Sequence, residues 1–239
     1  MRCLKKSISA INTGVFVVLL CISLGHASSL KVPFVNAQRL ILNDKKGSLL
    51  IRNGGDEPWL FHAWMERDGI GHLDKREDEA IISGMVFPEV ARLRGNSDFR
   101  LSVTIPGEAS AERESMYWLV VRFVPVKYIK ENSLTLPVAY RMKVFYRPPM
   151  LTNKTPNPCA LQWETDRETV RVTNRTGFHF SLSSLNFEYD ALHIPAEDVL
   201  APGSKYEFKP LADAGPLLSF SYVNDRGVID STGINCVSA

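Results

Sequence analysis

The pattern of hydrophobic and polar residues predicts β-strands along most of the chain. Apolar and polar residues alternate, as expected for strands with one buried face, in residues 39–42, 48–52, 59–64 and 99–105. Clusters of Gly, Asn, Asp and Pro, which favour turns, lie between these runs at residues 53–56, 94–96 and 106–107. No segment of ten or more residues has a convincing helical period. Several short strands separated by turns predict a β-sandwich.

Residues 116–121 differ from the alternating strands because they are apolar on both faces, which predicts a central strand of a sheet. Farther along, Pro148 and Pro149 interrupt strand pairing and stiffen the chain between two strand-rich halves. The strand pattern returns beyond the prolines in residues 169–173, 179–182 and 217–222. We therefore expect an all-β protein with an N-terminal domain at 28–148 and a C-terminal domain at 149–239.

The first 27 residues have the pattern of a cleaved signal peptide. Arg2, Lys5 and Lys6 precede the apolar run 15–24, and residues 25–27 (Gly-His-Ala) provide a cleavage site after Ala27. The apolar run is about ten residues long, whereas about twenty would be needed to span a bilayer. We expect export followed by removal of residues 1–27, and no stable membrane insertion of the mature chain.

The composition indicates a folded protein with little net charge. Of the 239 residues, 45% are hydrophobic and 23% are charged, which is ordinary for a globular protein. The formal charge of +2 comes from 28 Lys and Arg and 26 Asp and Glu. It becomes −1, or 25 minus 26, when Arg2, Lys5 and Lys6 leave with the signal peptide. So small a charge argues against nucleic acid as a partner.

Cys159 and Cys236 are the two cysteines that remain after Cys3 and Cys21 leave with the signal peptide. An oxidising destination makes them a candidate disulfide, and two buried free thiols are the alternative. We favour the disulfide because both positions flank the second half of the chain, where a bridge would join its first and last strands. In the chain-entropy model, a bridge that closes so long a loop contributes on the order of 4 kcal/mol.

The sequence offers little enzyme chemistry. The histidines of the mature chain lack paired ligand spacing, and two distant cysteines do not make a zinc site. Nucleophile-elbow, phosphate-loop and dinucleotide-binding motifs are missing. Acidic pairs such as Asp78 with Glu79 are interpreted as solvated charge. We expect a protein that is not an enzyme and that needs neither a metal nor another cofactor.

A long hairpin is the most distinctive feature of the chain. Its first strand begins near Arg113, a polar loop covers residues 127–133, and its second strand begins at Leu134. The apolar face of the second strand carries Leu134, Leu136, Val138, Tyr140 and Met142. Such a stripe most often packs into its own core. The functional alternative is an edge strand that offers backbone groups and apolar side chains to a partner, and Pro137 favours an edge position.

The hairpin resembles the signature of the PapD-like family of periplasmic pilus (fimbrial) chaperones. The motif consists of residues 113–115 (Arg-Glu-Ser) with the aromatic run after them, and of residues 141–148 (RMKVFYRP). Residues 38–41, 53–58 and 223–227 resemble further motifs of that family. The resemblance implies two immunoglobulin-like β-sandwich domains at an angle with a cleft between them. It also implies a periplasmic chaperone that binds, folds and caps pilus subunits for delivery to an outer-membrane usher.

The resemblance implies roles for five charged residues. Arg39 and Lys143 match the cleft cations that bind the C-terminal carboxylate of a pilus subunit. Carboxylates favour such charge-assisted donors. Glu114, Arg147 and Asp225 match the charges that link the two domains.

The alternating side chains of the hairpin match the strand that the chaperone donates to the groove of a subunit, namely Leu134, Leu136, Val138 and Tyr140. Donor-strand complementation of this kind supplies main-chain bonds and apolar side chains to an incomplete sandwich. The alternative from another class is a secreted adhesive or receptor-like binding protein with two immunoglobulin-like domains, in which the cations and the stripe are only structural.

Overall fold

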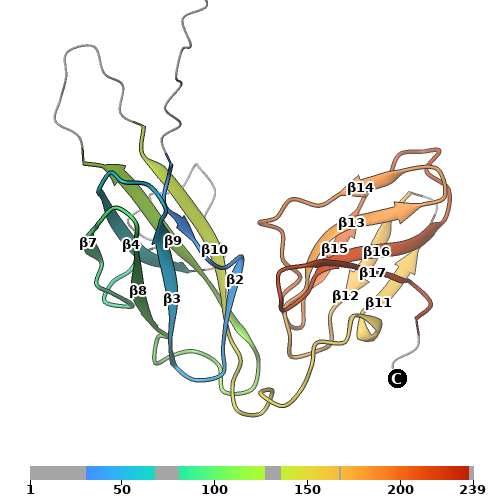
Figure 1. Cartoon of the computed structure of the whole chain (residues 1–239). Helices are drawn as coiled ribbons and strands as arrows, with labels where there is room; N and C mark the ends of the chain where they lie inside the picture. Colours follow the sequence, from blue (N-terminus) through green and yellow to red (C-terminus); the bar gives the residue numbers. More distant parts are fainter. Residues whose placement is uncertain (1–30, 68–80, 127–135, 167, 237–239) are drawn as a thin grey trace, which may run out of the picture. The chain divides into compact units, whose positions relative to one another are not determined.

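The computed structural model describes residues 31–67, 81–126, 136–166 and 168–236. The expected signal peptide, the hairpin loop 127–133 and Leu134 lie outside the described residues. Two groups of strands follow each other along the chain (Figure 1), and both belong to one compact unit, Val32–Ala239. Within the described part of the chain, no helix has the length and apolar character that crossing a membrane requires.

The first group of strands forms a sandwich of two sheets. One sheet has the order β1 (Phe34–Val35), β3 (Lys46–Asn53), β8 (Ser97–Thr104), β6 (Val86–Phe87). The other has the order β2 (Arg39–Leu42), β10 (Val138–Tyr146), β9 (Ser115–Pro125), β4 (Trp59–Arg67), β5 (Ile81–Ile82), and β7 (Val90–Leu93) also pairs with β4. Their buried side chains form one core around Ile51, Phe61 and Leu119.

The position of β9 confirms the prediction made from residues 116–121. This strand lies between β10 and β4, so both of its edges are paired. Side chains on one of its faces, such as Leu119, enter the core of the sandwich. Those on the other face include Met116 and Trp118, which pack with Phe145 and with Val199 of the second group of strands. Residues 116–121 are buried on both faces, which is why each of these positions is apolar.

The second group of strands forms another sandwich. One sheet has the order β11 (Gln162–Thr165), β12 (Val170–Thr173), β15 (Lys205–Phe208). The other has the order β14 (Ala191–His193), β13 (Ser181–Phe187), β16 (Leu217–Val223), β17 (Ile229–Gly233). Val172, Leu185 and Phe220 are at the centre of its core. Helical structure in the described residues is limited to the short 3-10 turn η2 (Pro158–Ala160), so the predicted all-β class is confirmed.

A buried asparagine holds a loop in each sandwich. Asn53 Nδ2 donates to the carbonyl oxygens of Glu57 at 2.8 Å and Arg94 at 2.9 Å, and its Oδ1 accepts from the Gly55 amide. Asn174 Nδ2 plays the same part in the second sandwich, where it donates to the carbonyl oxygens of Phe178, Leu200 and Ala201. Because both asparagines are buried, replacing either one would leave main-chain groups without partners.

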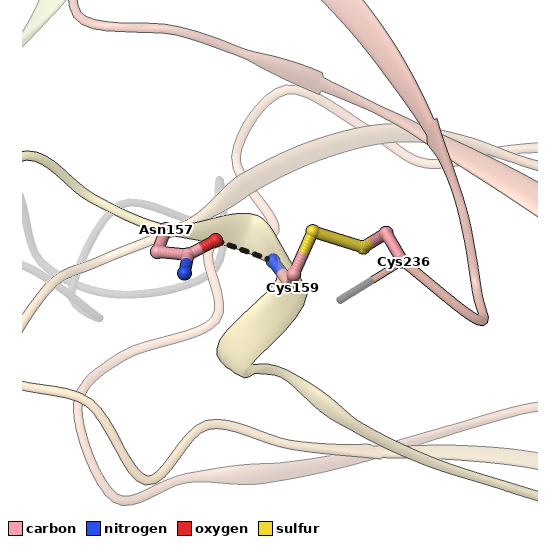
Figure 2. The surroundings of a disulfide bond; sticks show 3 residues. All are labelled: Asn157, Cys159 and Cys236. Carbon is pink, nitrogen blue, oxygen red and sulfur yellow. Dashed lines mark hydrogen bonds between the residues drawn. A yellow bond between two sulfur atoms is a disulfide. The ribbon is translucent and has the colours of Figure 1, made fainter. Parts of the chain in front are cut away.

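A disulfide joins Cys159 to Cys236, whose Cα atoms are 5.4 Å apart (Figure 2). Cys159 lies in η2, and its amide donates to Asn157 Oδ1 at 3.0 Å, the dashed line in Figure 2. Cys236 follows β17. The bridge therefore joins two segments that flank the strands of the second sandwich, 77 residues apart in the sequence.

Candidate functional site

Strand β10 has different neighbours along its length. It pairs antiparallel with β9 over all of its residues, from Val138 opposite Phe123 to Tyr146 opposite Ser115. It pairs in parallel with β2 only from Lys143 onward. Among the described residues, no strand pairs with residues 138–142 on that second side. An open strand edge therefore ends at Lys143.

Arg39 and Lys143 lie at the end of this open edge. They are partners in the register between β2 and β10, so their side chains emerge next to each other on the same face of the sheet. Arg39 Nη1 donates to the carbonyl oxygen of Val223 at 3.0 Å, and its guanidinium lies 5.4 Å from the centroid of the Phe145 ring. Lys143 is buried, and its Nζ donates to Ser181 Oγ at 3.0 Å. The structure thus brings the two predicted anchor cations together.

The surroundings of Arg39 favour the binding of an anion. Burial lowers the pKa of Arg39 from its ordinary value, although the carboxylates of Asp225 and Glu114 act in the opposite direction. Its hydrogen-bond partner is a neutral carbonyl, and within the described part of the chain no carboxylate forms an ion pair with it. A partly buried cation without a contacting counter-charge gains much from an arriving carboxylate.

Glu114, Arg147 and Asp225 form one ion-pair network. Arg147 donates to Glu114 Oε1 through Nε at 3.1 Å and Nη2 at 3.0 Å. It also donates to Asp225 Oδ2 through Nη1 at 2.9 Å and to Oδ1 through Nη2 at 3.1 Å. Burial alone would lower the pKa of Arg147, but the bond to Asp225 and the charge of Glu114 outweigh it and raise that pKa. The network connects the two sandwiches, because Asp225 follows β16 whereas Glu114 and Arg147 flank β9 and β10.

His179 and Phe178 complete the network, and the sequence did not reveal them. Glu114 Oε2 accepts a hydrogen bond from the His179 amide at 2.8 Å and lies 3.2 Å from Nδ1 of the same residue. The Phe178 ring lies 4.9 Å from the Arg147 guanidinium. His179 is 65 residues from Glu114, and no motif spacing connects the two. Only the folded chain brings this second set of partners to the carboxylate.

The apolar stripe of β10 is divided between core and solvent. Met142 is buried in the core of the first sandwich, and Tyr140 is half-buried against the same core. Val138 is half-buried at the start of the strand, and Leu136 is 65% exposed. Pro137 immediately precedes β10, so it removes no bond from the ladder with β9. Core packing thus describes the end of the stripe at Met142, whereas Leu136 is exposed and Val138 and Tyr140 are half-buried.

The fold and the site together define a binding protein made of two β-sandwiches, with a cationic pair beside an open strand edge. Among the described residues, no group of three or more His, Cys, Asp or Glu side chains could hold a metal ion. Residues 34–152 match the family described as "Pili and flagellar-assembly chaperone, PapD N-terminal domain". Residues 157–233 match the family described as "Pili assembly chaperone PapD, C-terminal domain". The chain therefore belongs to the PapD family of pilus-assembly chaperones.

Individual relatives agree with this assignment. The chain is 29% identical over 194 residues to the probable fimbrial chaperone YadV of Escherichia coli K12, an alignment covering 74% of this chain and 77% of that protein. It is 24% identical to the E. coli K12 chaperone protein FimC, covering 77% and 75%. These matches favour a chaperone over the receptor-like alternative.

Solved structures show the same fold. The E. coli chaperone DraB matches with a TM-score of 0.68 at 24% identity, covering 84% of this chain and 96% of that one. A chain from the complex of the Salmonella enterica SafA pilin with the SafB chaperone matches with a TM-score of 0.70 at 20% identity, covering 87% and 98%.

Proposed function

We propose that this protein is a periplasmic chaperone that binds pilus subunits along the open edge of β10 and through the cations beside it. The observation that carries the proposal is the register pair Arg39 and Lys143, which places two cations where the open edge ends. The last strand of a subunit can pair with residues 138–142 while its C-terminal carboxylate binds both cations. The SafA–SafB complex shows that a chaperone with this fold binds a pilin.

The anchor and the edge act together in this mechanism. A subunit with an incomplete sandwich has an apolar groove and unpaired main-chain groups, and a donated strand fills both needs. Leu136 and Val138 provide accessible apolar side chains, and Leu134 extends the proposed set outside the described residues. Tyr140 belongs to the same proposed set, and its half-buried ring also packs against the core of its own sandwich. The carboxylate sets the register, since a slip of one residue would turn every apolar side chain to the wrong face.

The remaining features of the proposal concern the whole chain. Residues 1–27 act as a cleaved signal, and residues 28–148 and 149–239 are the two domains, which the network around Arg147 holds together. The family matches, which end at residue 152 and resume at 157, support a boundary near Pro148 and Pro149. The chaperone delivers its subunit to an outer-membrane usher and catalyses no reaction.

Peptides with free and amidated C-termini test the anchor. The probe is a synthetic peptide with the alternating apolar pattern of a pilin's last strand, and its affinity is measured by calorimetry. A hydrogen bond to a charged group contributes roughly 1.5 to 3 kcal/mol, so the wild type should bind the acid at least about tenfold more tightly than the amide. Lys143→Ala and Arg39→Ala should remove this preference while the protein stays folded.

Lys46, an exposed cation on β3, provides the matched control. Lys46→Ala should retain the full preference for the acid. Equal affinity of the wild-type protein for the acid and the amide would show that no carboxylate is bound at Arg39 and Lys143, and the proposal would then be wrong.

A further inference from the structure

Arg141 is a second cation close to the proposed anchor. It lies two residues before Lys143 in β10, so both side chains emerge on the same face of the sheet. A carboxylate bound to Arg141 would shift the paired strand by two residues, or about 7 Å. Such a shift keeps the apolar face but moves every side chain to the next position in the groove. Pairing in the correct register therefore requires the carboxylate to bind Lys143 rather than Arg141.

The structure holds Arg141 in a set of contacts of its own. Its Nε donates to Glu66 Oε2 at 3.1 Å, and its guanidinium lies 3.9 Å from the centroid of the Trp118 ring. Glu66 Oε1 accepts from Trp64 Nε1 at 3.0 Å, so both carboxylate oxygens have partners. One edge and one face of the guanidinium are thus occupied within the first sandwich.

The strand registers build this cluster. Across β10, β9 and β4, the residues Lys143, Trp118 and Glu66 occupy one row. Arg141 lies two residues from Lys143 along β10, and its guanidinium contacts the same indole ring. The centroid of that ring is 5.6 Å from Lys143 Nζ. Aromatic faces attract cations, and a guanidinium stacks on an indole better than an ammonium does. Trp118 therefore lies beside both cations and stacks with Arg141.

The Arg141–Glu66 pair is also more shielded than exposed pairs of the same sandwich. The side chains of Arg141 and Glu66 are 30% and 17% exposed, compared with 52% and 39% for Arg52 and Asp98. Shielding from solvent strengthens an ion pair. The negative charge of Glu66 also repels a second carboxylate. Arg39, in contrast, is hydrogen-bonded to a neutral carbonyl, and within the described residues the nearby carboxylates of Asp225 and Glu114 form no ion pair with it.

We propose that Glu66 and Trp118 determine the register of the client by occupying Arg141, so that an arriving carboxylate binds only at Arg39 and Lys143. The inference rests on the proposed function and assigns that site two further specificity-determining residues. Glu66 acts through Arg141, and Trp118 stacks with Arg141 while also lying beside Lys143. Loss of Glu66 should therefore produce a second binding register displaced by two residues, rather than a loss of binding.

Site-specific crosslinking measures the register directly. The probe is the acid peptide carrying one photoreactive residue, and mass spectrometry identifies the chaperone residues to which it becomes linked. Wild-type protein should give one set of linked positions. Glu66→Gln should add a second set displaced by two residues along β10. The double variant Glu66→Gln with Arg141→Ala should return to the single set, because the competing cation has been removed.

Two variants complete the design. Asp98→Asn removes a carboxylate from the exposed pair on β8 and should leave a single set of crosslinks. Arg141→Lys keeps the charge but loses the planar stacking group, so it should produce the displaced set without any change at Glu66. If Glu66→Gln does not fold, the Arg141→Lys variant still tests whether the displaced set forms.

The outcomes separate this inference from the proposed function. A single set of crosslinks in Glu66→Gln and in Arg141→Lys, with the preference for the acid peptide retained, overturns the inference and leaves the anchor intact. A displaced set that persists in the double variant also overturns it, because Arg141 then does not bind the carboxylate. If the wild type does not distinguish the acid from the amide, the proposed function itself has failed.

Discussion

The two halves of β10 differ in pairing, burial and charge. Residues 143–146 pair with a strand on each side, their side chains are buried, and the ion-pair network of Arg147 follows them. Residues 138–142 pair with β9 alone among the described strands, and Leu136 before them is exposed. One strand thus combines a stable frame with an available edge. The edge can stay open without unfolding the protein, because residues 138–142 pair with β9 on their other side and Met142 packs in the core.

The largest expected effect is at the buried end of the strand. Arg147→Ala leaves Glu114, whose side chain is 2% exposed, without its counter-charge. Breaking a buried pair by removing one partner costs about 3 to 5 kcal/mol, so the midpoint of urea unfolding should fall strongly. Arg147→Lys should be intermediate because an ammonium cannot bind both carboxylates in the same geometry. Arg52→Ala in an exposed pair is the control and should change little, whereas an unchanged midpoint for Arg147→Ala contradicts the comparison.

The opposite result is expected at the open end. Leu136→Ser should weaken capture of a pilus subunit roughly 10- to 100-fold, because burial of a leucine side chain contributes about 1.5 to 3 kcal/mol. Its unfolding midpoint should stay at the wild-type value, since Leu136 is 65% exposed in the free protein. Leu218→Ser, at an exposed leucine of the second sandwich, should change neither quantity and serves as the matched control. Loss of folding in Leu136→Ser would mean that the stripe belongs wholly to its own core.

The smallest expected difference is in unfolding free energy, when a valine is replaced by alanine in each half of β10. Val144 is fully buried, so Val144→Ala should cost about 2 kcal/mol of unfolding free energy. Val138 is half-buried at the open end, and Val138→Ala should cost less than about 0.5 kcal/mol. Both values come from parallel urea titrations of the two variants. Equal costs would remove the distinction between the two halves.

Local pattern predicted several of the strands, whereas the charged residues of the site came from the resemblance to the PapD-like family. Alternation shows which face of a strand is buried, and the apolar run 116–121 indicated a central strand. Both predictions were possible because these signals depend only on residues that are close together in the sequence. The family resemblance implied that Glu114, Arg147 and Asp225 belong together. The structure brings Glu114 and Asp225 to Arg147, as the motif implied, although their functional role stays a proposal.

The order of residues along the chain was enough to predict the strand periodicity and the all-β class. It did not determine where the stripe leaves the core, because Leu136, Tyr140 and Met142 share one alternating pattern. The position at which the stripe leaves the core depends on where β2 pairs with β10 and on which side chains the core of the sandwich contains. Contacts between residues far apart in the sequence, such as His179 with Glu114 and Glu66 with Arg141, form only when the chain folds. A period of two residues specifies a face of the sheet, but strand order and register specify which side chains meet on it.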